Sequence, residues 1–459
     1  MTNLPFLNRR EELGRLRALL GRRSGTLAVL YGRRRCGKSR LIQQALPPAR
    51  SIYYVGDDRE PALQRASLAA HIARRLPGFD RAVYPEWDAL LDRFWAEAPS
   101  ATVLALDEFP ALASTAPELP SLLQKRLDQR PGRRIHLVLS GSSQRMMHGL
   151  VLDRAAPLYG RAQEILRMGP LAPGWIRDAL KLRDAVAAID AYSVWGGIPR
   201  YWELAATRGA LDDAVKAHVL SPLGVLHQEP ATLLLDDLRD TTQAASILSV
   251  VGQGAHRVSE IAGRLEKPAT SLARPLALLV ELGLVRRETP FGVNPKDSKR
   301  ALYQLADPFL QFWFRFVEPH RSRLAAGHVD DVWTDIQKRW AQHVAATWED
   351  LARQSVPALR CHGYTWQSAS RWWGAGRDKT PMEIDVVAES TNGKAVLLGE
   401  VRWSDGSTKD EVSALASRAA NFPEARGRTI CLALWLKRRR RPTNGTAIYT
   451  PSDVLGALR

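Results

Sequence analysis

Short apolar runs alternate with amphipathic stretches over residues 1–170. Residues 26–31 (TLAVLY), 102–106 (TVLAL) and 135–139 (IHLVL) are β-prone runs of this kind. Continuous apolar runs are typical of strands that are buried on both faces of a parallel sheet, and the amphipathic stretches between them are typical of helices. The pattern therefore predicts an α/β domain over residues 1–170.

The pattern changes three times after residue 170. Residues 171–240 have a helical pattern with Pro–Gly and Gly–Gly breaks, and we interpret them as a helical lid. Residues 241–305 predict three helices and a short β-ribbon, which is the order of a winged helix. Residues 306–459 start with aromatic, helical sequence and turn to strands near Glu383, which predicts a C-terminal α/β domain. We expect these four segments to be separate domains.

Composition narrows the class of protein. The chain has 459 residues, an ordinary balance of 45% hydrophobic and 25% charged residues, and a net charge of +17. The positive surplus either attracts a polyanion such as nucleic acid or reflects arginine used wherever a solvated cation suffices.

The number and spacing of the cysteines and the hydropathy pattern indicate the cellular compartment in which we expect the protein. The cysteines Cys36, Cys361 and Cys431 are far apart, which excludes a disulfide framework. No apolar run approaches the roughly 18 residues that span a bilayer, and the N-terminus lacks the pattern of a signal peptide. We expect a soluble cytoplasmic protein without membrane contact.

A glycine-rich segment joins the first apolar run to an amphipathic stretch. Residues 32–39 (GRRRCGKS) match the GxxxxGK[ST] pattern between a strand and a helix, which predicts a P-loop. Gly32 and Gly37 allow backbone N–H groups to turn toward phosphates. Lys38 is expected to reach the β- and γ-phosphates and Ser39 to ligate Mg²⁺. The predicted ATP-binding segment also includes Arg33, Arg34, Arg35, Cys36 and Arg40.

Polar residues follow the other two apolar runs. Asp107 is placed to hold Mg²⁺, and Glu108 is placed to polarise the attacking water as general base. Ser140 and Ser142 follow the third run, where a hydroxyl either senses the γ-phosphate or belongs to a polar turn. These residues predict an enzyme that binds and hydrolyses ATP with Mg²⁺.

The order of motifs resembles the archaeal-type AAA+/STAND ATPases. The resemblance rests on FLNRREEL at 6–13, GRRRCGKS at 32–39, LDEF at 106–109, LSGSS at 139–143, LYGR at 158–161, GGIPRY at 196–201 and YQLADPFLQFW at 303–313. It implies an ASCE-type parallel sheet, with Arg9 near the adenine. It also implies that Arg161 is an arginine finger or sensor, acting either within its own chain or toward a neighbour in an oligomer. Either arginine could instead form a structural salt bridge.

The predicted winged helix has two interpretations. It either contacts DNA through its third helix and ribbon, or packs on the nucleotide domain as in the ATPases that the chain resembles. The third helix offers Ser271 and Arg274 as readers of bases, so sequence-specific recognition is not expected. The ribbon cations are Arg286, Arg287, Lys296, Lys299 and Arg300.

Two strand-like segments, 383–388 and 395–402, flank Asn392-Gly393, the preferred centre of a two-residue type I′ turn. That turn would place Asp385 opposite Glu400 and Glu383 opposite Arg402, with all four on one face. Opposed carboxylates repel unless something neutralises them, and a divalent cation would do so.

This pattern resembles the restriction-endonuclease-like fold, with an acid on one strand and Glu-x-Lys on the next. The resemblance implies a DNA nuclease in which Glu349, Asp385 and Glu400 bind Mg²⁺ or Mn²⁺. Asp385 and Glu400 would then be catalytic together with Arg402, which stands where the family has lysine. Arginine stabilises phosphate charge but is not a base. The alternative is an inactive module that binds nucleic acid or a protein partner, with a plain Glu383–Arg402 ion pair.

Two further clusters bear on the partner. Aromatic residues lie among cations and form either a base-stacking surface or a core; they are Trp366, Trp372, Trp373 and Trp403, among Arg371, Arg377 and Lys379. Residues 437–441 (KRRRR) are either a solvated turn or a nucleic-acid contact. The expected partners are ATP, DNA, and a protein partner or a second copy of the chain.

Overall fold

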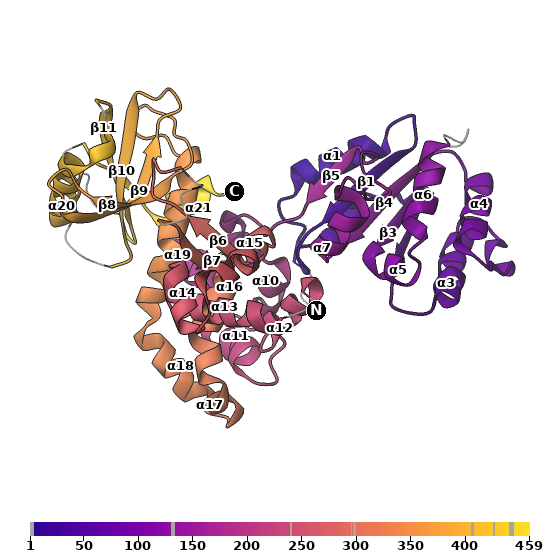
Figure 1. Ribbon diagram of the computed structural model, residues 1–459, viewed down its shortest axis with the longest axis horizontal. Coiled ribbons are helices and arrows are strands. Elements are labelled where there is room, and N and C mark those ends of the chain that lie inside the picture. Colours follow the sequence, from indigo (N-terminus) through magenta and orange to yellow (C-terminus); the bar gives the residue numbers. More distant parts are fainter. Residues whose placement is uncertain are drawn as a thin grey trace. The chain divides into compact units, whose positions relative to one another are not determined.

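The computed structural model describes residues 4–129, 134–238, 241–294, 296, 300–404, 408–425, 427–439 and 445–459. Lys299, Arg440 and Arg441, which belong to the two predicted basic clusters, lie outside the described residues. The chain divides into two compact units (Figure 1). The N-terminal unit comprises Arg9–Pro170 and Leu235–Arg239. The C-terminal unit comprises Met1–Asn8, Leu171–Leu234 and Asp240–Arg459.

The N-terminal unit alternates strands and helices, as its hydrophobic pattern predicts. Its strands are β1 (Thr26–Tyr31), β2 (Ser51–Val55), β3 (Thr102–Asp107), β4 (Ile135–Gly141) and β5 (Glu164–Arg167). Its helices are α1 (Arg10–Leu20), α2 (Lys38–Ala45), α3 (Pro61–Ala73), α4 (Trp87–Glu97), α5 (Phe109–Thr115), α6 (Leu119–Asp128) and α7 (Gln144–Met147).

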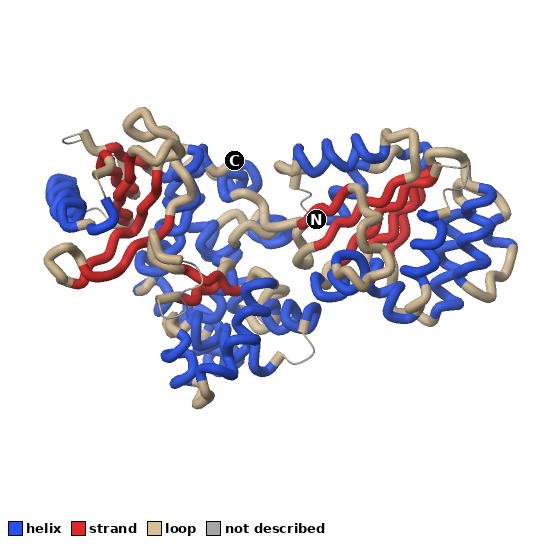
Figure 2. Tube along the Cα trace, turned by 45° about the horizontal axis from the view of Figure 1, so that its top comes forward, coloured by secondary structure: helices blue, strands red, loops and turns tan. Residues whose placement is uncertain are grey.

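All pairings in this sheet are parallel, and the strand order is β2-β3-β4-β1-β5. The expected parallel sheet is therefore confirmed, and β4 lies between the P-loop strand and the strand that ends in Asp107, as the ASCE arrangement implies. Helices lie on both sides of the strands (Figure 2). This explains why β1, β3 and β4 are apolar runs without alternation.

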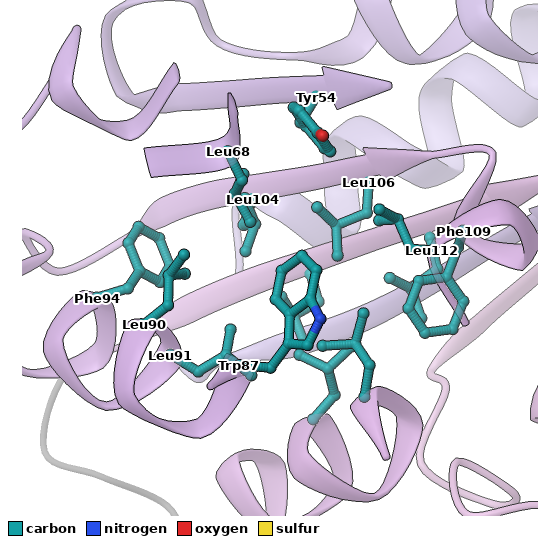
Figure 3. Close-up of a cluster of buried hydrophobic side chains, with 14 of the residues drawn as sticks. Tyr54, Leu68, Trp87, Leu90, Leu91, Phe94, Leu104, Leu106, Phe109 and Leu112 are labelled. Atoms are coloured by element: carbon teal, nitrogen blue, oxygen red, sulfur yellow. The ribbon is translucent and has the colours of Figure 1, made fainter. Parts of the chain in front are cut away.

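One large hydrophobic core joins this sheet to α3, α4 and α5 (Figure 3). Trp87 and Phe94 of α4 are almost fully buried in it, and Leu104 of β3 and Phe109 of α5 belong to the same core. A closely packed core of this kind fixes the ends of the strands, and those ends carry the candidate site.

The C-terminal unit begins with a helical segment. Its α-helices are α8 (Ile176–Leu180), α9 (Ala185–Trp195), α10 (Pro199–Ala205), α11 (Leu211–Val215) and α12 (Glu229–Asp237), and the last residues of α12 belong to the N-terminal unit. The predicted three helices and ribbon follow as α13 (Thr242–Gly252), α14 (Val258–Arg264), α15 (Ala273–Glu281), β6 (Val285–Glu288) and β7 (Leu302–Leu305). β6 and β7 are antiparallel.

The remainder of the unit is a mixed sheet flanked by helices. The helices are α16 (Pro308–Phe312), α17 (Arg321–Ala325), α18 (Val329–Lys338), α19 (Trp340–Ser355), α20 (Thr408–Asn421) and α21 (Pro451–Ala457). The strands are β8 (Ser370–Ala375), β9 (Pro381–Glu389), β10 (Ala395–Arg402), β11 (Thr429–Leu436) and β12 (Ala447–Tyr449), in the order β12-β11-β10-β9-β8. α19 contacts β9 and β10, α20 contacts β10 and β11, and the two helices flank the sheet (Figure 1).

The register between β9 and β10 is the predicted one. Paired residues run from Glu389 opposite Val396 to Val386 opposite Gly399, and Asp385 and Glu400 occupy the next position on each strand. The turn differs from the prediction. Its loop spans residues 391–394, because Ser390 N–H donates to the carbonyl of Ala395 at 3.0 Å and Gly393 N–H donates to that of Ser390 at 2.9 Å. The four-residue loop leaves the register unchanged because it closes the same pair of strands symmetrically.

Across the described part of the chain, none of the helices combines the length and the apolar character needed to cross a lipid bilayer.

Candidate functional site

The predicted P-loop connects the carboxyl end of β1 to the start of α2. Gly32 has φ +138°, and a Cβ atom at this position would lie 2.2 Å from the carbonyl oxygen of Met168. Gly37 has φ +89° and is the N-cap of α2. Both positions therefore require glycine, and they bring the backbone to the N-terminus of α2, where N–H groups are available to bind an anion.

Lys38 lies inside this loop and is only 5% exposed. Its ammonium donates to the carbonyls of Gly32 at 2.8 Å and Arg33 at 3.2 Å. Burial lowers the pKa of Lys38, while the negative charges of Glu108 and Asp107 act in the opposite direction. A buried cation inside a glycine cradle is suited to a phosphate group, so the residues present fit the nucleotide that the sequence predicts.

Asp107 lies at the carboxyl end of β3 and is almost fully buried. Tyr53 of β2 donates its hydroxyl to Oδ2 of Asp107 at 2.6 Å, and Ser140 of β4 donates to Oδ1. Burial, and then the hydrogen bond to Asp107, raise the pKa of Tyr53, while hydrogen bonds with Gln43 and Ser39 lower it. Residues of the two neighbouring strands therefore orient the Asp107 carboxylate, the predicted Mg²⁺ ligand. Asp107 lies close to Ser39, the predicted Mg²⁺ ligand of the P-loop.

Sequence analysis did not single out Tyr53. It lies in an apolar run, SIYYV, where an aromatic residue is typical of a core. No signal in the sequence separates Tyr53 from Tyr54; the structure does so, because Tyr54 is buried and Tyr53 is only half-buried.

Glu108 follows Asp107 in a left-handed conformation, with φ 51°. Its carboxylate accepts from the backbone N–H of Ser142 at 3.1 Å and from the Ser142 hydroxyl. The tip of β4 therefore holds the predicted general base, and the structure brings both candidate serines to the two acids. Ser140 contacts Asp107, and Ser142 contacts Glu108.

A second pair of acids reaches this site from the last turn of α12. Asp236 Oδ1 lies 3.7 Å from a guanidinium nitrogen of Arg34 in the P-loop. Asp237 accepts from the Ser143 hydroxyl at 3.2 Å and from the Arg145 N–H at 3.4 Å. Burial raises the pKa of both acids. Sequence analysis missed them because their motif, LLLDDLRD, looks like an ordinary helix end in a different segment.

Arg9 lies on the carboxyl side of β5, the same edge of the sheet as the P-loop. It is 8% exposed, pairs with Glu12 at 2.9 Å and donates to the carbonyl of Gly169. Its role near the adenine stays a prediction, because these contacts also make it a structural salt-bridge residue.

Arg161 lies at the opposite edge of the sheet. It precedes β5, whose first residue pairs with Ala28 near the start of β1, and it forms a two-point ion pair with Asp128, at 2.8 and 2.7 Å. Asp128 precedes β4, so both residues lie at the amino ends of the strands. This position, away from the P-loop at the carboxyl ends, favours the structural salt bridge over a sensor or finger that acts within the same chain, and that role stays a prediction. A role toward a neighbouring copy stays a prediction.

In the C-terminal unit, a cavity of about 480 Å³ is lined by Glu383, Asp385 and Glu400 of the sheet and by Arg418 of α20. Asp385 Oδ2 accepts from the Val401 N–H at 2.9 Å. The side chain therefore takes the place of the next backbone hydrogen bond between β9 and β10. The two opposed carboxylates that the register predicts do meet in one cavity.

Glu400 is 3% exposed, and each of its oxygens pairs with a different guanidinium. Arg402 binds Oε1, and Arg418 binds Oε2. Burial and the charge of Asp385 raise the pKa of Glu400 to about 7, against the two arginines. The expected Glu383–Arg402 ion pair is wrong. Glu383 faces β8 and pairs with Arg371 there, because Arg402 is held by the acid on its own strand.

Glu349 of α19 lies near enough to Asp385 to be affected by its charge, but the two residues line different cavities. Glu349 lines a cavity of about 440 Å³ with Asp350 and Arg353. Burial and the charge of Asp385 raise its pKa to about 7. Among the described residues, no group of three or more His, Cys, Asp or Glu side chains is arranged to hold a metal ion. The described structure therefore does not gather Glu349, Asp385 and Glu400 into one set of three metal ligands, and their role in metal binding stays a prediction.

Most of the described residues considered for nucleic-acid binding contact other residues of the C-terminal unit. Arg286 of β6 pairs with Asp350 at 2.6 Å and Glu288 at 2.7 Å, and Arg300 donates to the carbonyl of Trp373 at 2.5 Å. Three of the four tryptophans are core residues, with exposures of 2% for Trp366, 4% for Trp372 and 7% for Trp403. Lys437 lies over the ring of Trp403. These contacts favour a core role for three of the tryptophans, and they show that Arg286 and Arg300 are used in contacts within the C-terminal unit.

Two family models match the chain. Residues 6–204 match a family described as an ATPase domain predominantly from Archaea, and residues 313–414 match a family described as Archaea bacterial proteins of unknown function. With the sheet order and the P-loop geometry, the first match shows that the N-terminal unit is similar to ATPase domains of archaeal type. The second family's description names no activity, so the nuclease interpretation stays a prediction.

Individual proteins are similar over greater lengths. An uncharacterized protein of Methanocaldococcus jannaschii is 27% identical over 409 residues, which are 88% of this chain and 89% of that protein. The structure of a Walker-type ATPase of Pyrococcus abyssi is 20% identical with a TM-score of 0.51, and the match covers 67% of this chain and 95% of that one. The Aeropyrum pernix ORC2 protein, in ADPNP and ADP complexes, is 16% identical with a TM-score of 0.46, over 73% and 97% of the two chains. The Pyrococcus structure supports the fold of the region it covers.

Proposed function

We propose that the N-terminal unit binds ATP with Mg²⁺ and hydrolyses it. The observation that carries the proposal is the placement of Glu108, a carboxylate oriented by Ser142, at the strand end beside the P-loop that contains Lys38. Bound Mg²⁺ would neutralise phosphate charge and orient the phosphates.

The residues of the proposed ATP site have separate roles. Lys38 and the N–H groups at the start of α2 bind the phosphates, and Ser39 and Asp107 are the groups that would hold Mg²⁺. Glu108 accepts the proton of the attacking water, and Ser142 keeps its carboxylate turned toward the site. Tyr53 and Ser140 orient Asp107 through hydrogen bonds to its two oxygens.

Phosphate release from ATP tests this proposal. The purified chain should release phosphate only when Mg²⁺ is present, and Lys38→Ala should abolish both release and nucleotide binding. Glu97→Gln is the matched control, because Glu97 is an exposed acid of α4 that pairs with Arg93. Full activity in the Lys38→Ala variant would refute the proposal.

A second proposal concerns the C-terminal unit. We infer that it is a nuclease-like module that binds nucleic acid or a protein partner without cutting DNA. The supporting observation is Glu400, whose two oxygens are taken by Arg402 and Arg418. Because these arginines neutralise the carboxylate, the unit can fold without a divalent cation to screen Asp385 and Glu400.

DNA cleavage and filter binding distinguish the alternatives. We expect no cleavage of single- or double-stranded DNA in Mg²⁺ or Mn²⁺, with or without ATP. Cleavage that Asp385→Ala abolishes would instead establish a nuclease. Binding that weakens steeply as salt rises would identify nucleic acid as the partner, and absent or salt-independent binding would favour a protein.

A further inference from the structure

Asp236 places a negative charge beside the P-loop, which is suited to bind the phosphates of a nucleotide. It lies at the end of α12, in the segment Leu235–Arg239 that belongs to the N-terminal unit. It pairs with Arg34 of the P-loop at 3.7 Å, and its charge acts on the ammonium of Lys38. Any anion that Lys38 and Arg34 bind must therefore compete with this carboxylate.

The Asp236 side chain is half-buried, and hydrogen bonding does not explain why one of its oxygens is shielded from water. Its Oδ2 is buried and finds no hydrogen-bond partner among the described residues. The neighbouring Asp237 differs, because Ser143 and Arg145 both donate to it. Asp237 is thus explained as the residue that ties α12 to the tip of β4, whereas Asp236 keeps an unsatisfied oxygen at a cost to stability.

The electrostatic neighbours of Asp236 indicate where its charge acts. Burial raises the pKa of Asp236 most, the P-loop residue Arg34 lowers it, and Asp237 and then Glu108 raise it. Lys38 and Glu108 are the residues expected to act at the γ-phosphate. Coulomb energy falls with distance, so the Asp236 charge should act more strongly on the γ-phosphate than on the rest of the nucleotide.

We infer that Asp236 sets the preference between ATP and ADP, by opposing nucleotides that carry a γ-phosphate more than those that lack one. The inference rests on the proposed function, since it needs a nucleotide in the P-loop. With the Asp236 carboxylate present, the ratio of ATP affinity to ADP affinity is lower than it would be without this carboxylate. If Asp236 were only a salt-bridge partner for Arg34, its loss would change the affinity for both nucleotides alike.

Equilibrium binding of ADP and of the non-hydrolysable analogue AMP-PNP, both with Mg²⁺, tests the inference. We expect Asp236→Asn to tighten AMP-PNP binding by about five- to tenfold and ADP binding by less than about twofold. Glu97→Gln removes an equal charge from an exposed acid of α4 and should change neither. Circular dichroism would show whether each variant is folded, and Asp236→Ser provides a second uncharged side chain.

Equal shifts for the two nucleotides, no shift, or weaker AMP-PNP binding in both Asp236 variants would overturn the inference. Failure of the proposed function gives a different result: the unmodified chain would bind neither nucleotide, or Lys38→Ala would bind as tightly as the unmodified chain. An intact chain that binds both nucleotides, with an unchanged ratio in Asp236→Asn, would refute only the role of Asp236.

Discussion

The hydroxyl of Tyr53 donates a 2.6 Å hydrogen bond to Oδ2 of Asp107, from the neighbouring strand β2. Ser140 donates to the other oxygen from β4, on the opposite side of β3. Partners of this kind fix the orientation of a metal-binding carboxylate and affect metal affinity without touching the metal. Tyr53 is therefore a positioning residue for the proposed Mg²⁺ site.

Tyr53→Phe should raise the Mg²⁺ concentration needed for half-maximal ATP hydrolysis by about tenfold, because Asp107 loses one of its orienting hydrogen bonds. A Mg²⁺ titration of phosphate release measures this change. Tyr159→Phe is the control, since Tyr159 is 43% exposed. An unchanged Mg²⁺ requirement in Tyr53→Phe would show that the hydrogen bond from Tyr53 is not needed to orient Asp107.

Ser142→Ala should lower kcat by about tenfold and leave ATP affinity within about twofold, because Glu108 loses a hydroxyl partner but keeps the backbone N–H of residue 142. Steady-state hydrolysis and nucleotide binding, measured on the same preparation, separate the two effects. Ser114→Ala is the control, because the Ser114 hydroxyl only donates within its own helix. Loss of ATP binding in Ser142→Ala would place Ser142 in nucleotide binding instead.

Arg161→Ala should leave hydrolysis per chain within about twofold at protein concentrations where the rate per chain does not depend on concentration. The reason is its position at the amino ends of the strands, where it pairs with Asp128. A dilution series of the variant and the unmodified chain measures this. A large loss of hydrolysis at high dilution would contradict the placement of Arg161 away from the P-loop. A loss of hydrolysis confined to concentrated samples would show that Arg161 acts on a neighbouring copy of the chain.

Acid should remove the stability that neutral His343 contributes to the C-terminal unit. This side chain is fully buried among aromatic rings and donates from Nε2 to the carbonyl of Ser193, and burial lowers its pKa to about 4. A group whose pKa is depressed on folding contributes stability above its unfolded pKa, and that stability is lost as the pH falls toward its folded pKa. On the order of 2 kcal/mol of the His343 contribution should be lost between pH 7 and pH 5. Glu349 and Glu400, whose pKa values are raised to about 7, act in the opposite direction over this range, so the effect of His343 is the difference between the unmodified chain and a His343 variant.

Urea unfolding followed by tryptophan fluorescence, at pH 7 and pH 5, measures that loss. Between pH 7 and pH 5, His343→Gln should lose less stability, or gain more, than the unmodified chain, whatever its stability at pH 7. His328→Gln is the control, because His328 is exposed. An equal pH dependence in His343→Gln and the unmodified chain would rule out His343 as the source.

Features carried by short sequence spacing could be predicted. The P-loop, the two acids after β3 and the serines after β4 all lie at strand ends, and parallel strands bring those ends to one edge. The β9–β10 register was also accessible, because the symmetric placement of Asn392-Gly393 fixes the pairing even though the loop is longer than predicted.

Features that depend on strand order or on distant packing could not be predicted. Tyr53 meets Asp107 only because β2 pairs with β3, and Asp236 meets Arg34 only because the end of α12 packs in the N-terminal unit. The parity of β9 correctly placed Glu383 on the face of Asp385. It could not show that β8 supplies Arg371 as a nearer partner. Likewise, a motif does not show which edge of the sheet holds Arg161.

Single-turnover ATP hydrolysis by Glu108→Gln, alongside nucleotide binding, tests the central claim most directly. The substitution keeps the shape of the side chain and removes its basicity. The account predicts that ATP binds within about twofold of the unmodified chain while hydrolysis falls by at least about a hundredfold. Hydrolysis at an undiminished rate would contradict the assignment of Glu108 as the base, and with it the proposed active site.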